Sequence, residues 1–149
     1  MRRDPAALRR DAAANTAVEF ALLAPVLCFL LIGGAFFALG LYQYAALTQG
    51  VRTGARQLAS SLNDSTPYSD AVSALEGAAP ALSTGQLSIT ITVNGTACTT
   101  DSACKSALSG APVAAGATVT ATYPCSVVVM GHNYLPSCLL TSTATEMIE

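Results

Sequence analysis

An uninterrupted run of apolar residues dominates the first third of the chain. No charged side chain occurs from Phe20 to Tyr42, and Leu, Ala, Phe, Gly and Val make up most of this segment. About 20 such residues in a helix cross the hydrocarbon core of a bilayer. A buried core helix is the alternative, but a chain of this size has too small a core to enclose a helix that is apolar on all sides. The pattern therefore predicts a transmembrane helix over residues 15–42.

Beyond Tyr42 the apolar positions continue with a helical period. They recur at Leu47, Val51, Ala55, Leu58 and Leu62, while polar side chains cover most of the remaining positions. A spacing of 3.6 residues is typical of a helix with one apolar face. We therefore expect a single helix over about residues 16–62, whose outer part, residues 43–62, packs against other elements.

After residue 62 the sequence predicts shorter elements, first a helix and then a strand. Thr66 followed by Pro67 fits the N-cap and first turn of a short helix, which we expect over residues 66–77. Apolar and polar residues then alternate over Gln86–Val93, which predicts a half-buried strand. The pair Asn94-Gly95 that follows is typical of a tight turn.

The last third of the chain predicts further strands. A second strand alternates through Val119, Ala121 and Tyr123, with a resumption at Val127–Met130, and a third covers Leu139–Met147. The small, polar stretch from Thr96 to Gly116 is expected to be a loop with one helical turn around Cys104–Leu108. The predicted fold class is α+β, with the long helix and a short helix laid over a three- or four-stranded antiparallel sheet within residues 86–147.

Charge patterning predicts the orientation in the membrane. Four arginines (Arg2, Arg3, Arg9, Arg10) precede the apolar run, against two aspartates, and cationic flanks stay on the cytoplasmic side. Arg52 and Arg56 beyond the run weaken this bias without reversing it. The amino terminus is therefore expected in the cytoplasm and residues 43–149 outside it. The net charge of −2 argues against a nucleic-acid partner.

The five cysteines fit an oxidising compartment for residues 43–149. Cys28 lies in the apolar run and is interpreted as a small apolar residue. The other four allow two disulfides in three connectivities, of which we expect Cys98–Cys104 and Cys125–Cys138. They lack the C-x-x-C spacing of zinc sites, so no metal and no cofactor is expected. His132 is the only histidine, without a neighbouring acid, so the sequence offers no catalytic site and predicts a protein that is not an enzyme.

The stretch from Ala14 to Pro25 carries the most specific signal. A short basic leader, residues 1–14, ends in the small residue Ala14 and is followed by four spacers, Glu19, Phe20 and the apolar helix. A carboxylate that opens a membrane helix is costly, although the helix N-terminus favours an anion there, and Glu19 could serve only as such an interfacial acid. The arrangement as a whole resembles the class III signal of type IV prepilins.

Within that class the chain resembles the TadE-like family of the tight-adherence (Tad) pilus machinery. The similar segments are Ala17-Val18-Glu19-Phe20-Ala21-Leu22 with Pro25, then Val51-Arg52-Thr53-Gly54-Ala55-Arg56, and finally Leu140-Thr141-Ser142-Thr143-Ala144-Thr145-Glu146. The resemblance implies a pilin-like fold and cleavage by a prepilin peptidase between Ala14 and Asn15, where the family has Gly in place of Ala14. It also implies that Glu19 and Phe20 serve assembly.

The function implied is that of a minor pseudopilin in the bacterial inner membrane, which helps to initiate or cap a Tad/Flp type IVb pilus used for adherence. Its partners would be other Tad pseudopilins, pilus-assembly components and the prepilin peptidase. The alternative is a secreted or membrane-anchored extracytoplasmic binding domain with an ordinary signal peptide, for which Ala38-Leu39-Gly40 offers a small-x-small cleavage site. The length of the apolar run and the Glu that opens it count against this alternative.

Overall fold

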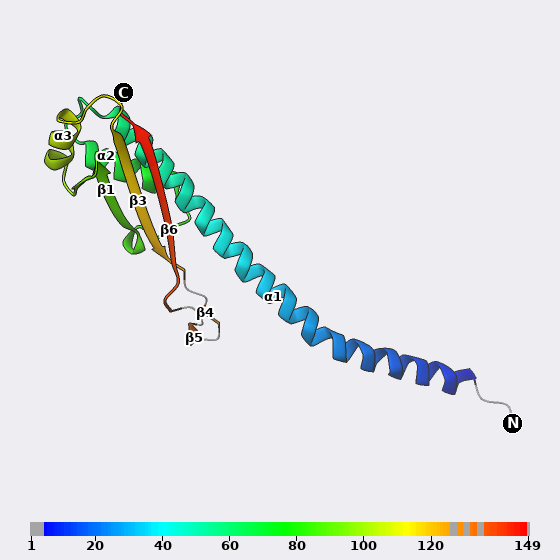
Figure 1. The fold of residues 1–149 in the computed structure, drawn as a ribbon. Coiled ribbons are helices and arrows are strands. Elements are labelled where there is room, and N and C mark those ends of the chain that lie inside the picture. Colours follow the sequence, from blue (N-terminus) through cyan, green and yellow to red (C-terminus); the bar gives the residue numbers. More distant parts are fainter. Residues whose placement is uncertain (1–4, 126–127, 130–131, 134–135, 149) are drawn as a thin grey trace. The chain divides into compact units, whose positions relative to one another are not determined.

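The computed structural model describes residues 5–125, 128–129, 132–133 and 136–148, with side chains for residues 18–125 and 136–148. The chain divides into two compact units, residues 1–39 and residues 40–149 (Figure 1). Among the described residues, the first unit contains only the beginning of the long helix. The second contains the rest of that helix, the shorter helices and all the strands.

Helix α1 spans Pro5–Ser60. It begins earlier than the expected residue 16, because the alanine-rich stretch before the apolar run is itself a good helix former. It ends two residues earlier than expected, where the hydroxyl of Ser61 donates to the carbonyl oxygen of Gln57 at 2.6 Å and Asn63 begins to turn the chain. The predicted long helix is confirmed with these corrected ends.

A four-stranded antiparallel sheet forms the centre of the second unit. Its strands are β1 (Ser88–Val93), β2 (Thr96–Cys98), β3 (Gly116–Pro124) and β6 (Leu139–Met147), in the order β2-β1-β3-β6. The strands β1 and β2 form a hairpin through Asn94 and Gly95, which both have positive φ (49° and 80°) as a two-residue type I′ turn requires. The α+β fold class is thus confirmed.

The expected resumption of the second strand after Pro124 is wrong as a continuation of this sheet. Val128–Val129 (β4) pairs instead with His132–Asn133 (β5) in a separate two-stranded ladder. Val127 and Met130, which the sequence placed in the same strand, lie outside the described residues. Pro124 ends β3, since a proline cannot donate to the ladder.

Two short helices and one 3₁₀ turn complete the second unit: α2 (Pro67–Ala78), η1 (Thr84–Gln86) and α3 (Asp101–Ser109). The helix expected over residues 66–77 is present, but the Thr66 side chain does not cap the backbone, because its hydroxyl donates to a carboxylate oxygen of Asp70 at 2.9 Å. The 3₁₀ turn at η1 makes the first strand start at Ser88, two residues later than expected.

The expectation of a loop between Thr96 and Gly116 is wrong. Strand β2 and helix α3 both lie there, and only the residues between and after them are irregular. Helix α3 begins where the hydroxyl of Thr100 accepts a hydrogen bond from the backbone N–H of Ala103 at 3.3 Å. This cap explains a nine-residue helix where one turn was expected.

The core lies between the sheet and the helices α1 and α2. It is built from fully buried aliphatic side chains of all three layers, which include Leu47, Val51, Leu58, Leu75, Ile91, Val93 and Val119. The opposite face of the sheet carries hydroxyl side chains that align in rows across β1, β3 and β6, namely Ser88–Thr122–Thr141, Thr90–Thr120–Thr143 and Thr92–Thr118–Thr145. The sheet is therefore apolar toward the helices and polar toward solvent.

Candidate membrane anchor and assembly surface

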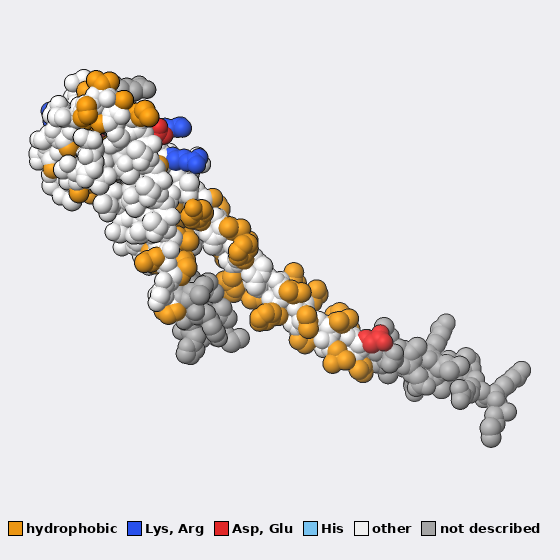
Figure 2. Space-filling view, viewed as in Figure 1, with side chains coloured by type: hydrophobic (Ala, Val, Ile, Leu, Met, Phe, Trp, Pro, Cys, Tyr) orange, Lys and Arg blue, Asp and Glu red, His pale blue; other side chains and the backbone are white. Residues whose placement is uncertain are grey.

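The first functional feature is the exposed apolar surface of α1. A window within Val18–Ser60 has a mean hydropathy of 2.5, and none of it is buried in the protein. Figure 2 shows apolar side chains over this part of the helix, and Phe20 and Phe29 are 70% and 80% exposed. Such a surface is unfavourable in water at about 25 cal/mol per Å² of apolar area. This single N-terminal apolar helix fits a single-pass membrane protein.

The predicted processing and assembly residues all lie on α1. Ala14 and Asn15 are helical, but their side chains lie outside the described residues. Glu19 and Phe20 are both exposed at the start of the apolar segment. Their roles in cleavage and assembly stay predictions.

The two disulfides connect different parts of the sheet to their neighbours. Cys98, at the end of β2, bonds to Cys104 in α3, with 5.1 Å between their Cα atoms. Cys125, directly after β3, bonds to Cys138, directly before β6, also with a Cα–Cα distance of 5.1 Å. These are the pairs that we expected from the sequence. The first holds α3 against the sheet, and the second closes the β3–β6 connection.

A close contact between α1 and α2 was not predicted from the sequence. A Cβ atom on Gly50 would lie 2.9 Å from the carbonyl oxygen of Leu75, and one on Gly54 would lie 3.0 Å from that of Ala71. The two glycines are four residues apart, so they share one face of α1. Their small-x-x-x-small spacing is a signal that could have suggested a close helix contact, although not its partner.

Helices α2 and α3 are joined by a carboxylate. Asp101, in the first turn of α3, accepts hydrogen bonds from the backbone N–H of Ser69 at 2.9 Å and from its hydroxyl at 2.7 Å. Ser69 belongs to the first turn of α2, whose N–H groups have no helical acceptor. The backbone N–H of Ser69, and next its hydroxyl, hold the pKa of Asp101 below its ordinary value. Asp101 thus caps α2 from a different helix.

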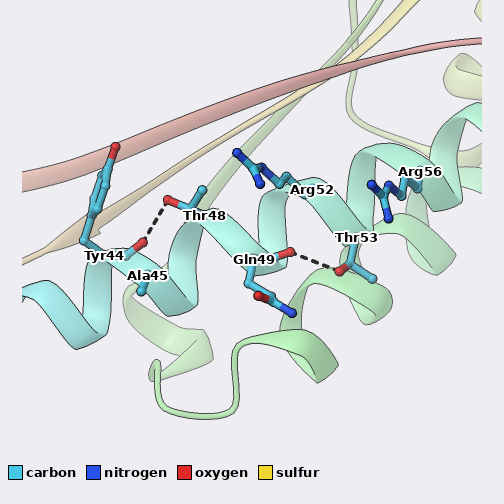
Figure 3. A pocket seen from close by; sticks show the side chains of 7 residues that line it. All are labelled: Tyr44, Ala45, Thr48, Gln49, Arg52, Thr53 and Arg56. Atoms are coloured by element: carbon cyan, nitrogen blue, oxygen red, sulfur yellow. Dashed lines mark hydrogen bonds between the residues drawn. The ribbon is translucent and has the colours of Figure 1, made fainter.

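A polar stripe runs along the outer part of α1. Its residues line an open depression and include Tyr44, Thr48, Gln49, Arg52, Thr53 and Arg56 (Figure 3). Two hydroxyls in the stripe are held by the helix itself, since Thr48 donates to the carbonyl oxygen of Tyr44 and Thr53 to that of Gln49. Arg52 and Arg56 are exposed.

Two residues of the stripe contact strand β6. Nε of Arg56 lies 3.4 Å from Oε1 of Glu146, and the hydroxyl of Ser142 lies 3.5 Å from that of Thr48. The Arg56 side chain is 76% exposed. An ion pair in such a setting contributes only about 0–1 kcal/mol to stability. The pair therefore indicates where α1 lies along β6 but adds little to the stability of the domain.

The comparisons with known proteins concern the same helix. The model of the family described as TadE-like protein matches residues 15–56. This segment is similar to the TadE-like family. The match agrees with the first two of the three similar segments and covers the apolar surface, Glu19 and the polar stripe, whereas the third segment, residues 140–146, lies outside it. No curated protein and no solved structure matches the chain. The TadE-like family indicates a role related to the Tad pilus.

Proposed function

We propose that this chain is a non-enzymatic, TadE-like minor pseudopilin that helps to initiate or cap a Tad/Flp type IVb pilus used in adherence. The observation that carries the proposal is the TadE-like match over residues 15–56, which contains both the apolar helix and Glu19. The partners are other Tad pseudopilins and components of the assembly machinery. The exposed apolar face of α1 and the polar stripe are the surfaces available for them.

The chain would sit in the bacterial inner membrane with residues 1–14 in the cytoplasm and the second unit in the periplasm. A prepilin peptidase would cut between Ala14 and Asn15, which leaves Glu19 close to the new amino group of Asn15 in the same or a neighbouring subunit. In a poorly screened site an ion pair offsets part of the cost of placing both charges there. Glu19 would then act in assembly, and Phe20 would contact neighbouring helices.

The size of the second unit supports a minor role. The described domain contains a four-stranded sheet, two short helices and two disulfides beyond α1. A domain of this size repeated at every step of a thin helical fibre would clash with its neighbours, because their helices stack with a small axial rise. One or a few copies at an end of the filament avoid this clash.

Replacement of Glu19 tests the proposal without disturbing the domain. We expect Glu19→Ala to leave membrane insertion and the disulfides intact while it abolishes rescue of piliation in a strain that lacks the native chain. The matched control is Glu76→Ala, which removes a carboxylate from α2 in the second unit. Full piliation with Glu19→Ala would contradict the assembly role. Glu19 would then be only an acid at the membrane interface.

A further inference from the structure

One edge of the sheet is open. Strand β6 has no strand neighbour on the side away from β3 among the described residues. At the two ends of the β3–β6 ladder, Cys125 N–H donates to the Cys138 carbonyl and Ile148 N–H donates to the Ala115 carbonyl. The even-numbered residues of β6 therefore bond to β3, and by alternation the odd-numbered ones direct their N–H and C=O groups outward. These outward residues are Leu139, Thr141, Thr143, Thr145 and Met147.

The sequence of this edge lacks the residues that usually block strand addition. It is nine residues long and contains no proline, no lysine and no glycine. Its only charged residue, Glu146, belongs to the side that faces α1, where it pairs with Arg56. Leu139 and Met147, at the two ends of the outward set, are large apolar side chains that are 66% and 71% exposed.

The polar stripe of α1 borders this edge with positive charge. Thr48 contacts Ser142 and Arg56 contacts Glu146. Thr48 to Arg56 covers about 12 Å along a helix, and Ser142 to Glu146 covers about 13 Å along a strand, so α1 and β6 run side by side in the same direction. Because Arg52 is midway between Thr48 and Arg56, this spacing places it at the level of Ala144. Figure 3 shows Arg52 on the side of α1 next to the β6 ribbon. Within the described residues Arg52 has no carboxylate partner.

We propose that the edge site, defined as the outward backbone of β6 together with Arg52, binds an extended acidic segment of another pilus-assembly protein by strand addition. The added strand would run antiparallel to β6 and bond to its outward N–H and C=O groups. Its side chains opposite the even residues of β6 would face α1, so a carboxylate opposite Ala144 would reach Arg52. Apolar side chains at its ends would contact Leu139 and Met147.

A second copy of this chain does not fit the edge site. An antiparallel pair of β6 strands reverses one domain relative to the other. Because residues 40–60 of α1 run parallel to β6, the two chains would then enter their domains from opposite ends. Two copies anchored in one membrane enter from the same end. The charge of Arg52 also favours an acidic partner over the threonine-rich β6, whose one carboxylate, Glu146, already pairs with Arg56.

A peptide titration tests the edge site with the full-length protein in nanodiscs. The probe is a labelled nine-residue peptide of alternating character, with valine or isoleucine at both ends, threonines facing outward and one glutamate placed opposite Ala144. We expect saturable binding, measured by fluorescence anisotropy, that weakens about tenfold when lysine replaces the glutamate. Equal affinity for both peptides, or no saturable binding, would overturn the proposal.

Two variants locate the binding. Arg52→Glu should weaken binding of the acidic probe about tenfold, whereas Lys105→Glu, a charge reversal on the exposed surface of α3, should leave it unchanged. Thr143→Pro removes an outward N–H and costs no backbone bond to β3, only the exposed hydroxyl contact with Thr120 at 3.1 Å. It should therefore abolish binding while most of the thermal stability is retained. Unchanged binding in both Arg52→Glu and Thr143→Pro would overturn the edge site.

The nature of the partner rests on the proposed pilus function. The experiments can nevertheless contradict the edge site and the pilus function independently of each other. A bald deletion strain without probe binding would remove the edge site and keep the pilus role. Probe binding combined with normal piliation of the deletion strain would remove the pilus role and keep the edge site.

Discussion

Gly50 in α1 lies so close to α2 that a Cβ atom on it would be only 2.9 Å from the carbonyl oxygen of Leu75. Gly54 meets the carbonyl oxygen of Ala71 in the same way at 3.0 Å. Since both obstacles are backbone atoms of α2, an added methyl group can be accommodated only if the two helices move apart. The outer part of α1 therefore packs on α2 through its glycines.

Alanine at either glycine should destabilise the second unit. We expect Gly50→Ala and Gly54→Ala each to lower the free energy of unfolding by about 1–3 kcal/mol, as overpacking does. Gly77 is the matched control, because it lies in α2 with open space around it, and Gly77→Ala should be neutral or stabilising by up to about 1 kcal/mol. Thermal melts of the full-length variants in detergent measure the difference. A melting temperature of Gly50→Ala at or above that of the unmodified protein would show that the contact is not tight.

Asp101 should make stability depend on pH in the acid range. Its pKa is lowered in the folded state by the Ser69 N–H, so its contribution is fully present above the unfolded pKa of about 3.9 and is lost as the pH falls through the lower folded value. Asp101→Asn should therefore lower the melting temperature near neutral pH and have progressively less effect below about pH 4. Asp64→Asn, an exposed aspartate in the turn after α1, is the control. A deficit of Asp101→Asn that stays constant down to about pH 2 would rule out the carboxylate as the cause.

Removal of the Cys125–Cys138 disulfide should destabilise the second unit. The double variant Cys125→Ser with Cys138→Ser loses the closure of a 13-residue separation between β3 and β6, and we expect a loss of about 2–4 kcal/mol. Cys28→Ser, outside both disulfides, should have no effect. Peptide mapping without reduction checks the pairing at the same time, and a peptide that joins Cys98 to Cys125 or Cys138 would contradict it.

The mature amino terminus separates the proposed function from the alternative of an ordinary secreted domain. Mass spectrometry of the protein from membranes of cells with a working prepilin peptidase should find a chain that begins at Asn15. A chain cut after Gly40 would support the signal-peptide alternative. A chain that still begins at Met1 would refute the predicted cleavage.

The elements with a clear period could be predicted from the sequence. Strand β6 has the predicted ends, Leu139 and Met147, because its nine residues alternate without interruption and lack the breakers that end a strand. The apolar positions of α1 from Leu47 to Leu58 are all buried, as their helical spacing predicted.

The elements that the sequence did not predict are β2 and the full length of α3, and both depend on contacts that give no periodic signal. Strand β2 is only three residues long, too short for a visible alternation, and forms because the Asn94-Gly95 turn brings it against β1. Helix α3 is held by the Cys98–Cys104 disulfide and the Thr100 cap, neither of which gives a periodic signal. In the candidate site, the closeness of Arg52 to β6 depends on how α1 lies along the sheet. The amino-acid sequence shows that residue 52 is a charged arginine, but it does not show that this residue lies next to β6.

Subunit counting in sheared pili tests the central claim, the proposal that this chain is a minor subunit at an end of the filament. Quantitative mass spectrometry of pili purified from the native strain gives its molar ratio to the major pilin. We expect trace amounts, together with loss of pili in the deletion strain and their return with the full-length chain. A ratio close to one copy per major subunit would contradict the account, because a domain with a four-stranded sheet would then repeat along the whole fibre.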